Sequence, residues 1–127
     1  MNTDTPVEHL PHRRAAREAV AEAVKGKYVL IFYAQTVQQL QLLLQRHGLG
    51  QALAGLHLRA GGRPGSPYGL LIRQLDRWIL TTQAVSARSA LAALATHDSR
   101  FYREATAQAW LFVRALREIL EQEAPAS

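Results

Sequence analysis

His47-Gly48-Leu49-Gly50-Gln51-Ala52-Leu53-Ala54 is the stretch that decides the fold, because it ends one apolar-periodic segment and begins another around two glycines. Glycine adopts the left-handed backbone conformation that closes a helix without steric cost. The residues that follow, Leu49 to Leu58, are rich in Leu and Ala, which are strong helix formers. The stretch therefore predicts a junction between two helices, with Gly48 closing the first.

Apolar residues at helical spacing extend from this junction toward both ends of the chain. Six helices are predicted, at His12 to Val24, Tyr28 to Arg46, Leu49 to Leu58, Pro67 to Gln83, Ser86 to Thr96, and Asp98 or Ser99 to Glu123. Ser66 is expected to cap the fourth helix, with Pro67 in its first turn. We predict an all-α fold, a compact single-domain bundle over residues 12–123, preceded by a loose segment at residues 1–11.

The segment Val29-Leu30-Ile31-Phe32-Tyr33 has the β-branched and aromatic content of a strand. Its apolar residues nevertheless continue at helical spacing through Leu44, and glutamines occupy the opposite side. No other segment is a candidate to pair with such a strand, and an isolated strand cannot satisfy its backbone hydrogen bonds. The segment is therefore predicted to open the second helix.

Composition bounds the class of protein. The chain has 127 residues, 48% of them hydrophobic, which is enough for one packed core. It has no cysteine, so disulfides and thiolate chemistry are excluded. The early acids and prolines do not resemble a secretory signal, and Gln and Arg interrupt every apolar run before it reaches membrane-spanning length. We expect a cytoplasmic protein that does not enter a membrane.

Candidate catalytic motifs are weak. His97-Asp98-Ser99 contains the residue types of a hydrolase triad, but adjacent residues cannot converge on one another. The glycine-rich segment at residues 61–65 lacks the preceding strand and the Lys-Ser/Thr pair of a phosphate loop. The histidines lack metal-ligand spacing, and no carboxylate cluster completes a site. We therefore expect a protein that is not an enzyme and has no catalytic residues, no metal and no cofactor.

Charge is segregated along the chain. The net charge is +5, but Lys25 to Arg117 contains twelve basic residues against three acidic ones, and both ends carry net negative charge. A folded body of this kind attracts polyanions, and a nucleic-acid backbone is the commonest polyanion in the cytoplasm. An alternative interpretation is a simply solvated arginine-rich surface. The candidates for RNA phosphate contact are Lys25, Lys27, Arg46, Arg73, Arg77, Arg100, Arg103, Arg114 and Arg117.

The last predicted helix has two distinct faces. Its core stripe runs from Phe101 to Leu120, and four of the candidate arginines gather on the other side. Trp110 lies among these arginines. An indole flanked by guanidinium groups suits RNA stacking or a protein interface, and it could equally fold over the first helix as part of the core.

Some apolar residues are predicted to point away from the core. Ile31 and Leu42 do so on the second helix, and Leu70 and Leu80 do so on the fourth. Scattered exposed apolar residues are normal, but four on two long helices can form a docking surface. Together with Trp110 they are the candidate subunit-interface residues.

A second block, Asp98-Ser99-Arg100-Phe101-Tyr102-Arg103-Glu104-Ala105-Thr106, follows the glycine junction by about fifty residues. The blocks "GLGQALA" and "YREAT", in this order and at this spacing, resemble the small all-helical subunit of the Cmr-type (type III-B) CRISPR effector complex. Lys27-Tyr28 and Ser66-Pro67-Tyr68 add to the resemblance. It covers about Arg13 to Ile119, which is nearly the whole chain.

The resemblance implies a non-catalytic subunit that stacks with copies of itself in the inner filament of the complex. Its implied partners are the other Cmr subunits, the guide RNA and the target RNA, in antiviral defence. Base pairing with the guide reads the sequence in such complexes, so this subunit would need only backbone contacts.

The alternative function is a free-standing helical DNA-binding or adaptor protein, in which the helix after Gly48 mimics a helix-turn-helix. That helix is short and mostly Ala and Leu, so it offers few groups to base edges.

Overall fold

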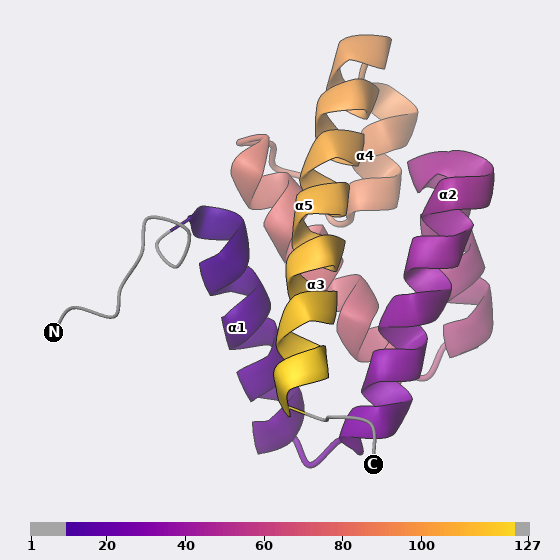
Figure 1. Ribbon diagram of the computed structural model, residues 1–127. Coiled ribbons are helices and arrows are strands. Elements are labelled where there is room, and N and C mark those ends of the chain that lie inside the picture. Colours follow the sequence, from indigo (N-terminus) through magenta and orange to yellow (C-terminus); the bar gives the residue numbers. More distant parts are fainter. Residues whose placement is uncertain (1–9, 124–127) are drawn as a thin grey trace, which may run out of the picture.

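A computed structural model describes residues 10–123. Over this range the chain forms five helices: α1 (Pro11–Lys25), α2 (Leu30–Ala60), α3 (Pro67–Thr82), α4 (Ala90–Thr96) and α5 (Ser99–Glu123). Figure 1 shows α5 between α1 and α2, with α3 and α4 behind it. The predicted all-α fold is confirmed. The loose segment predicted at residues 1–11 falls mostly outside the described residues, and Pro11 already belongs to α1.

The predicted helices at Tyr28 to Arg46 and Leu49 to Leu58 are the two halves of the element labelled α2, so residues 10–123 carry five labelled helices where six are predicted. The junction between them is nevertheless present, because Gly48 has non-helical dihedrals of φ 83° and ψ 175°. A methyl group added at Gly55 would lie 3.2 Å from the Leu43 side chain, so the two halves of α2 fold back on each other. Figure 1 shows this reversal near the α2 label.

The two sequence blocks meet at this reversal. A helix that restarts after Gly48 leaves the N–H groups of its first turn without helical acceptors. The Tyr102 hydroxyl, from the first turns of α5, accepts a hydrogen bond of 2.9 Å from the Gly50 N–H. The same hydroxyl would lie 3.2 Å from a β-carbon added at Gly48. Tyr102 therefore caps the second half of α2 and fixes α5 against the turn.

We expect Tyr102→Phe to lower the free energy of unfolding by about 1–2 kcal/mol, because the Gly50 N–H loses its acceptor. Chemical denaturation followed by circular dichroism measures this. Tyr68→Phe is the matched control, since the half-buried Tyr68 hydroxyl makes no hydrogen bond within the described part of the chain and should lose less than about 0.5 kcal/mol. Equal losses in the two variants would contradict the capping role.

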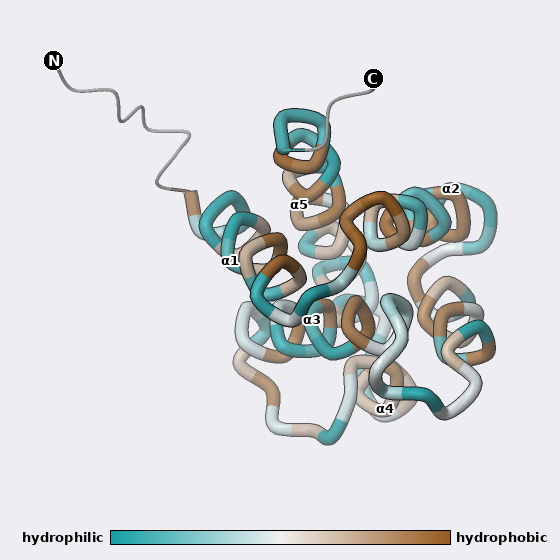
Figure 2. The backbone as a smooth tube through the Cα atoms, turned by 90° about the horizontal axis from the view of Figure 1, so that it is seen from below, coloured by the Kyte–Doolittle hydropathy of each residue, from teal (hydrophilic) through white to brown (hydrophobic). Residues whose placement is uncertain are grey.

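The core follows the predicted periodicity closely. On α5 every residue of the predicted stripe is buried, and Ala115 joins it. The strand-like segment that opens α2 is helical from Leu30, as predicted, and Tyr33 is fully buried. Figure 2 shows hydrophobic and hydrophilic stretches alternating along the helices, as expected when each helix turns one face inward. Val24, Val29, Ile31, Phe32 and Leu58 are exceptions, because they remain more than half exposed.

A polar network crosses the interior where α1, α2 and α3 meet. The Tyr33 hydroxyl donates to the Gln74 side-chain carbonyl. The Gln74 amide donates to the Ala19 carbonyl and to the Glu22 carboxylate, each at 3.0 Å. Burial raises the pKa of the Tyr33 phenol, and the nearby Glu22 charge raises it further. One side chain on α3 thus joins three helices through hydrogen bonds.

Two predicted helix caps are confirmed, and one predicted helix start is wrong. Ser66 caps α3 by accepting from the Gly69 N–H at 3.0 Å, and Asp98 caps α5 by accepting from the Phe101 N–H at 3.0 Å. The predicted start of the next-to-last helix at Ser86 is wrong. This helix, α4, begins at Ala90, and Ser89 is its cap.

The late start of α4 has a tertiary cause. The Asp76 carboxylate on α3 accepts from the Ala90 N–H at 2.9 Å and fixes the first residue of the helix there. Burial raises the pKa of the Asp76 carboxyl, although this hydrogen bond and the nearby His57 act in the opposite direction. The helix start is therefore set from another helix, which local sequence does not reveal.

Candidate nucleic-acid interface

The candidate basic residues divide according to whether an acidic side chain lies beside them. Three are paired: Arg77 with Glu22 at 3.6 Å, Arg100 with Glu104 at 3.2 Å, and Arg117 with Glu121 at 3.8 Å. Arg117 also donates to the Gln41 side-chain carbonyl. A carboxylate at this distance offsets much of the attraction that a phosphate would feel. These three arginines are therefore the weaker candidates.

Arg103 and Arg114 have no carboxylate partner within the described residues. They lie eleven positions apart on α5, which places them on the same side of the helix three turns apart. The Arg114 guanidinium lies 5.4 Å from the centre of the Trp110 ring, a cation–π contact. We call Arg103, Trp110 and Arg114 the α5 basic face.

Trp110 is half-buried and packs against the core with part of its ring. The indole is therefore partly a core residue and partly available at the surface. Arg114 stacked on it is held in place without being neutralised.

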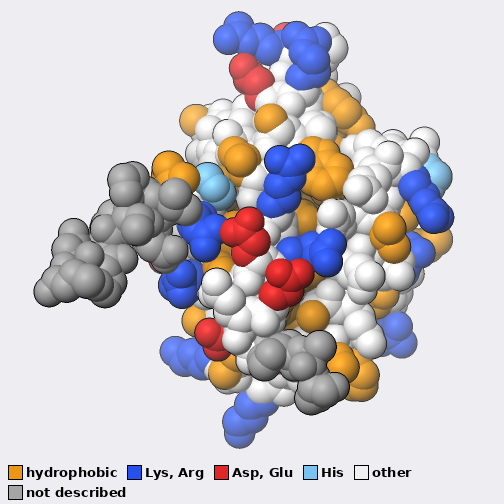
Figure 3. Space-filling view, in the orientation of Figure 1, with side chains coloured by type: hydrophobic (Ala, Val, Ile, Leu, Met, Phe, Trp, Pro, Cys, Tyr) orange, Lys and Arg blue, Asp and Glu red, His pale blue; other side chains and the backbone are white. Residues whose placement is uncertain are grey.

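Three further candidates, Lys25, Lys27 and Arg46, belong to other parts of the chain than α5. Lys25 ends α1, and Lys27 closes it in a left-handed conformation with φ 64°. Arg46 is exposed near the turn of α2. Figure 3 shows Lys and Arg side chains distributed over this face of the molecule, with acidic side chains among them, and no single deep groove collects them.

The predicted interface residues are only partly exposed. Ile31 is 59% and Leu42 is 37% exposed, as predicted. Leu70 is 2% exposed, so the prediction that it points outward is wrong. It is buried because α3 packs against all four other helices, so the buried surface of α3 is wider than the single predicted stripe. Leu80 is half-buried and packs against the core.

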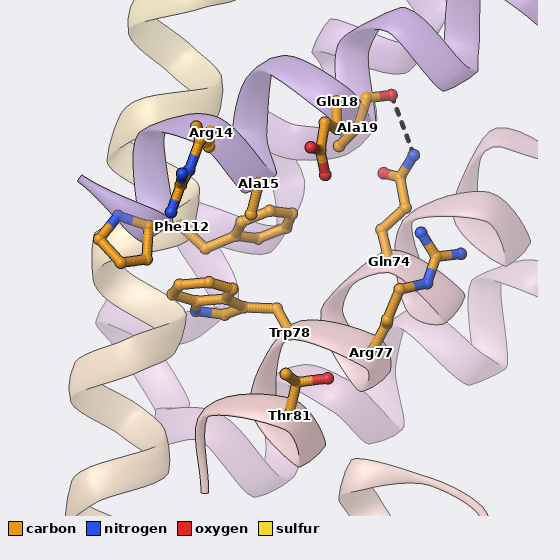
Figure 4. Close-up of a pocket in the computed structure, with 10 residues that line it drawn as sticks. Arg14, Ala15, Glu18, Ala19, Gln74, Arg77, Trp78, Thr81 and Phe112 are labelled. Atoms are coloured by element: carbon orange, nitrogen blue, oxygen red, sulfur yellow. Dashed lines mark hydrogen bonds between the residues drawn. The ribbon is translucent and has the colours of Figure 1, made fainter. Parts of the chain in front are cut away.

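A cavity of ≈ 390 Å³ opens between α1, α3 and α5, with Arg14 and Arg77 at its rim. Figure 4 shows Trp78 and Phe112 at one side of it and Gln74 at the other. Trp78 is 9% exposed, and its ring stacks on Phe112 with centroids 5.9 Å apart and donates its N–H to the Gln108 carbonyl. These aromatic rings are occupied by the core, so we assign no ligand to this cavity.

Sequence reasoning missed one basic cluster. Arg63, which the sequence places in the glycine-rich segment at residues 61–65, lines a cavity of ≈ 380 Å³ together with Arg73 and His57. We call this cavity the linker notch. No periodicity marks it, because its residues come from the end of α2, from the linker and from α3. The only sequence signal was an arginine between glycines.

Within residues 10–123 no cluster of three or more His, Asp or Glu side chains could hold a metal ion. None of the helices in that range has the length and apolar character to cross a membrane.

The fold and surface define a class: a small all-helical protein with exposed arginines spread over several helices. Residues 12–122 match the model of a family described as CRISPR-associated protein (Cas_Cmr5). The chain belongs to this family, and it is a small subunit of a Cmr-type (type III-B) CRISPR complex. Comparisons with curated proteins and with solved structures gave no match.

Proposed function

We propose that this chain is a non-catalytic small subunit that stacks with copies of itself in the inner filament of the cytoplasmic Cmr complex and contacts the RNA backbone. Residues 12–123 are its folded domain. The exposed Ile31 and Leu42 are the proposed contacts with neighbouring subunits. Leu70 is not part of this proposed interface, because its side chain is buried.

The α5 basic face is the observation that supports RNA contact. Two guanidinium groups that have no acidic partner among the described residues share one side of a helix with a partly exposed indole. Arginine pairs with phosphate oxygens, and aromatic rings stack on bases or riboses without sequence preference. A strand whose sequence is read by base pairing with a guide needs contacts of this kind.

Reversing the charges with Arg103→Glu and Arg114→Glu should lower retention of target RNA by the reconstituted complex about tenfold or more. Both residues are exposed, so the variant should fold and assemble. The measurement is filter retention of labelled target RNA by complexes containing equal amounts of each variant.

The control is Arg59→Glu with Arg88→Glu, which makes the same change in net charge at exposed positions outside the α5 basic face. We expect a smaller loss in the control. Assembly and RNA retention equal to the parent in the Arg103 and Arg114 variant would contradict RNA contact by this face.

A further inference from the structure

The linker notch is built from three consecutive parts of the chain. His57 and Ala60 come from the end of α2, Gly62 to Pro64 come from the linker, and Gly69, Ile72 and Arg73 come from α3. Gly69 allows the close packing of linker and helix, because an added β-carbon would lie 2.7 Å from the Pro64 carbonyl oxygen. The linker therefore packs directly against the first turn of α3.

Both arginines in the notch are held by backbone carbonyl groups. Arg73 Nη1 donates to the Pro64 oxygen at 2.6 Å, and Arg63 Nε donates to the Ala60 oxygen at 3.2 Å. Carbonyl oxygens orient a guanidinium without cancelling its charge. Each group keeps further N–H donors, because an arginine carries five. The side chains are thus preorganised, and the entropy cost of fixing them on a ligand is reduced.

The notch carries positive charge, and none of the described residues that line it is acidic. Neither Arg63 nor Arg73 lies within ion-pair distance of a carboxylate in the described part of the chain. His57 lies close enough to Asp76 to act on it electrostatically, but Asp76 is not among the lining residues and accepts from the Ala90 N–H. Gly62 also lines the notch, and its N–H makes no hydrogen bond within residues 10–123, so this backbone group can donate to a ligand.

We propose that the linker notch binds one phosphate group of an RNA backbone through Arg63 and Arg73, with the Gly62 N–H as a further donor. This inference rests on the proposed function and names a contact that lies outside the α5 basic face. Two guanidinium groups oriented by backbone carbonyls, together with a backbone N–H, can donate hydrogen bonds to the oxygens of a phosphodiester.

The test is fluorescence anisotropy of the full chain with a labelled single-stranded RNA over a salt series. Arg63→Gln with Arg73→Gln should weaken binding about tenfold at low salt and reduce the magnitude of the salt slope by about one. The control, Arg59→Gln with Arg88→Gln, removes the same net charge outside the notch and should weaken binding less than about threefold. Equal losses in the two variants would overturn the notch proposal.

Nitrogen-detected NMR of the arginine Nε–H groups tests the same contact in the parent chain, so folding defects in the variants cannot affect the result. In the parent chain, RNA should shift the Arg63 and Arg73 signals, and inorganic phosphate should shift them only at much higher concentration. Shifts with phosphate but none with RNA would indicate a free-phosphate site and overturn the RNA assignment. RNA binding that is lost on reversal of Arg103 and Arg114 but unaffected by the notch variant would refute the notch alone. No RNA binding by chain or complex would refute both proposals.

Discussion

Gly48→Ala is expected to lower the free energy of unfolding by about 3 kcal/mol. The dihedrals of φ 83° and ψ 175° at this position belong almost exclusively to glycine, and a residue with a β-carbon is strained there. The added β-carbon also approaches the Tyr102 hydroxyl at 3.2 Å, so relieving the contact weakens the cap on Gly50. Urea denaturation followed by circular dichroism and by tryptophan fluorescence measures the loss.

Gly65→Ala is the matched control for this substitution. An added β-carbon at Gly65 meets no atom within 4 Å, and the backbone there does not require glycine. Its stability should change by less than about 0.5 kcal/mol. If the two alanine variants unfold at the same denaturant concentration, the turn at Gly48 does not determine the fold.

Gln74→Leu is expected to cost a similar amount, about 3 kcal/mol, although the replacement preserves most of the volume. The buried Tyr33 hydroxyl loses its acceptor, and Glu22 loses a donor at the edge of the network. Tyr33→Phe alone should cost about 1–2 kcal/mol, because the Gln74 carbonyl oxygen is then left without its donor.

The double variant distinguishes a hydrogen-bonded network from simple packing. When both partners are replaced by apolar groups, no buried polar atom of that pair remains unsatisfied. Tyr33→Phe with Gln74→Leu should therefore lose at least about 1 kcal/mol less than the sum of the two single variants. Strictly additive losses in the denaturation series would contradict the network.

The sequence predicted most of this fold because helical periodicity is a local property. The core stripe of α5 and the caps Ser66 and Asp98 all follow from residues within a few positions of one another. The start of α4 did not follow, because Asp76 on another helix determines it. Leu70 was misplaced for a similar reason. Its spacing points outward from the predicted stripe, but α3 packs against helices on several sides and Leu70 is buried among them.

The candidate site was less predictable than the fold. A helical projection places Arg103, Trp110 and Arg114 on one side of α5, and this follows from the sequence alone. Which arginines have acidic partners depends in part on tertiary contacts, such as that of Arg77 with Glu22 on α1. The linker notch depends wholly on how the linker lies against α3, so no sequence pattern could identify Arg63.

The salt dependence of target-RNA binding by the assembled complex tests the central claim most directly. Each phosphate contact that is lost lowers the magnitude of the slope of log affinity against log salt by about one. The complex carrying Arg103→Glu and Arg114→Glu should bind more weakly than the parent at every salt concentration, with a slope smaller by about two. Identical affinity and identical slope in fully assembled complexes would contradict RNA contact by the α5 basic face.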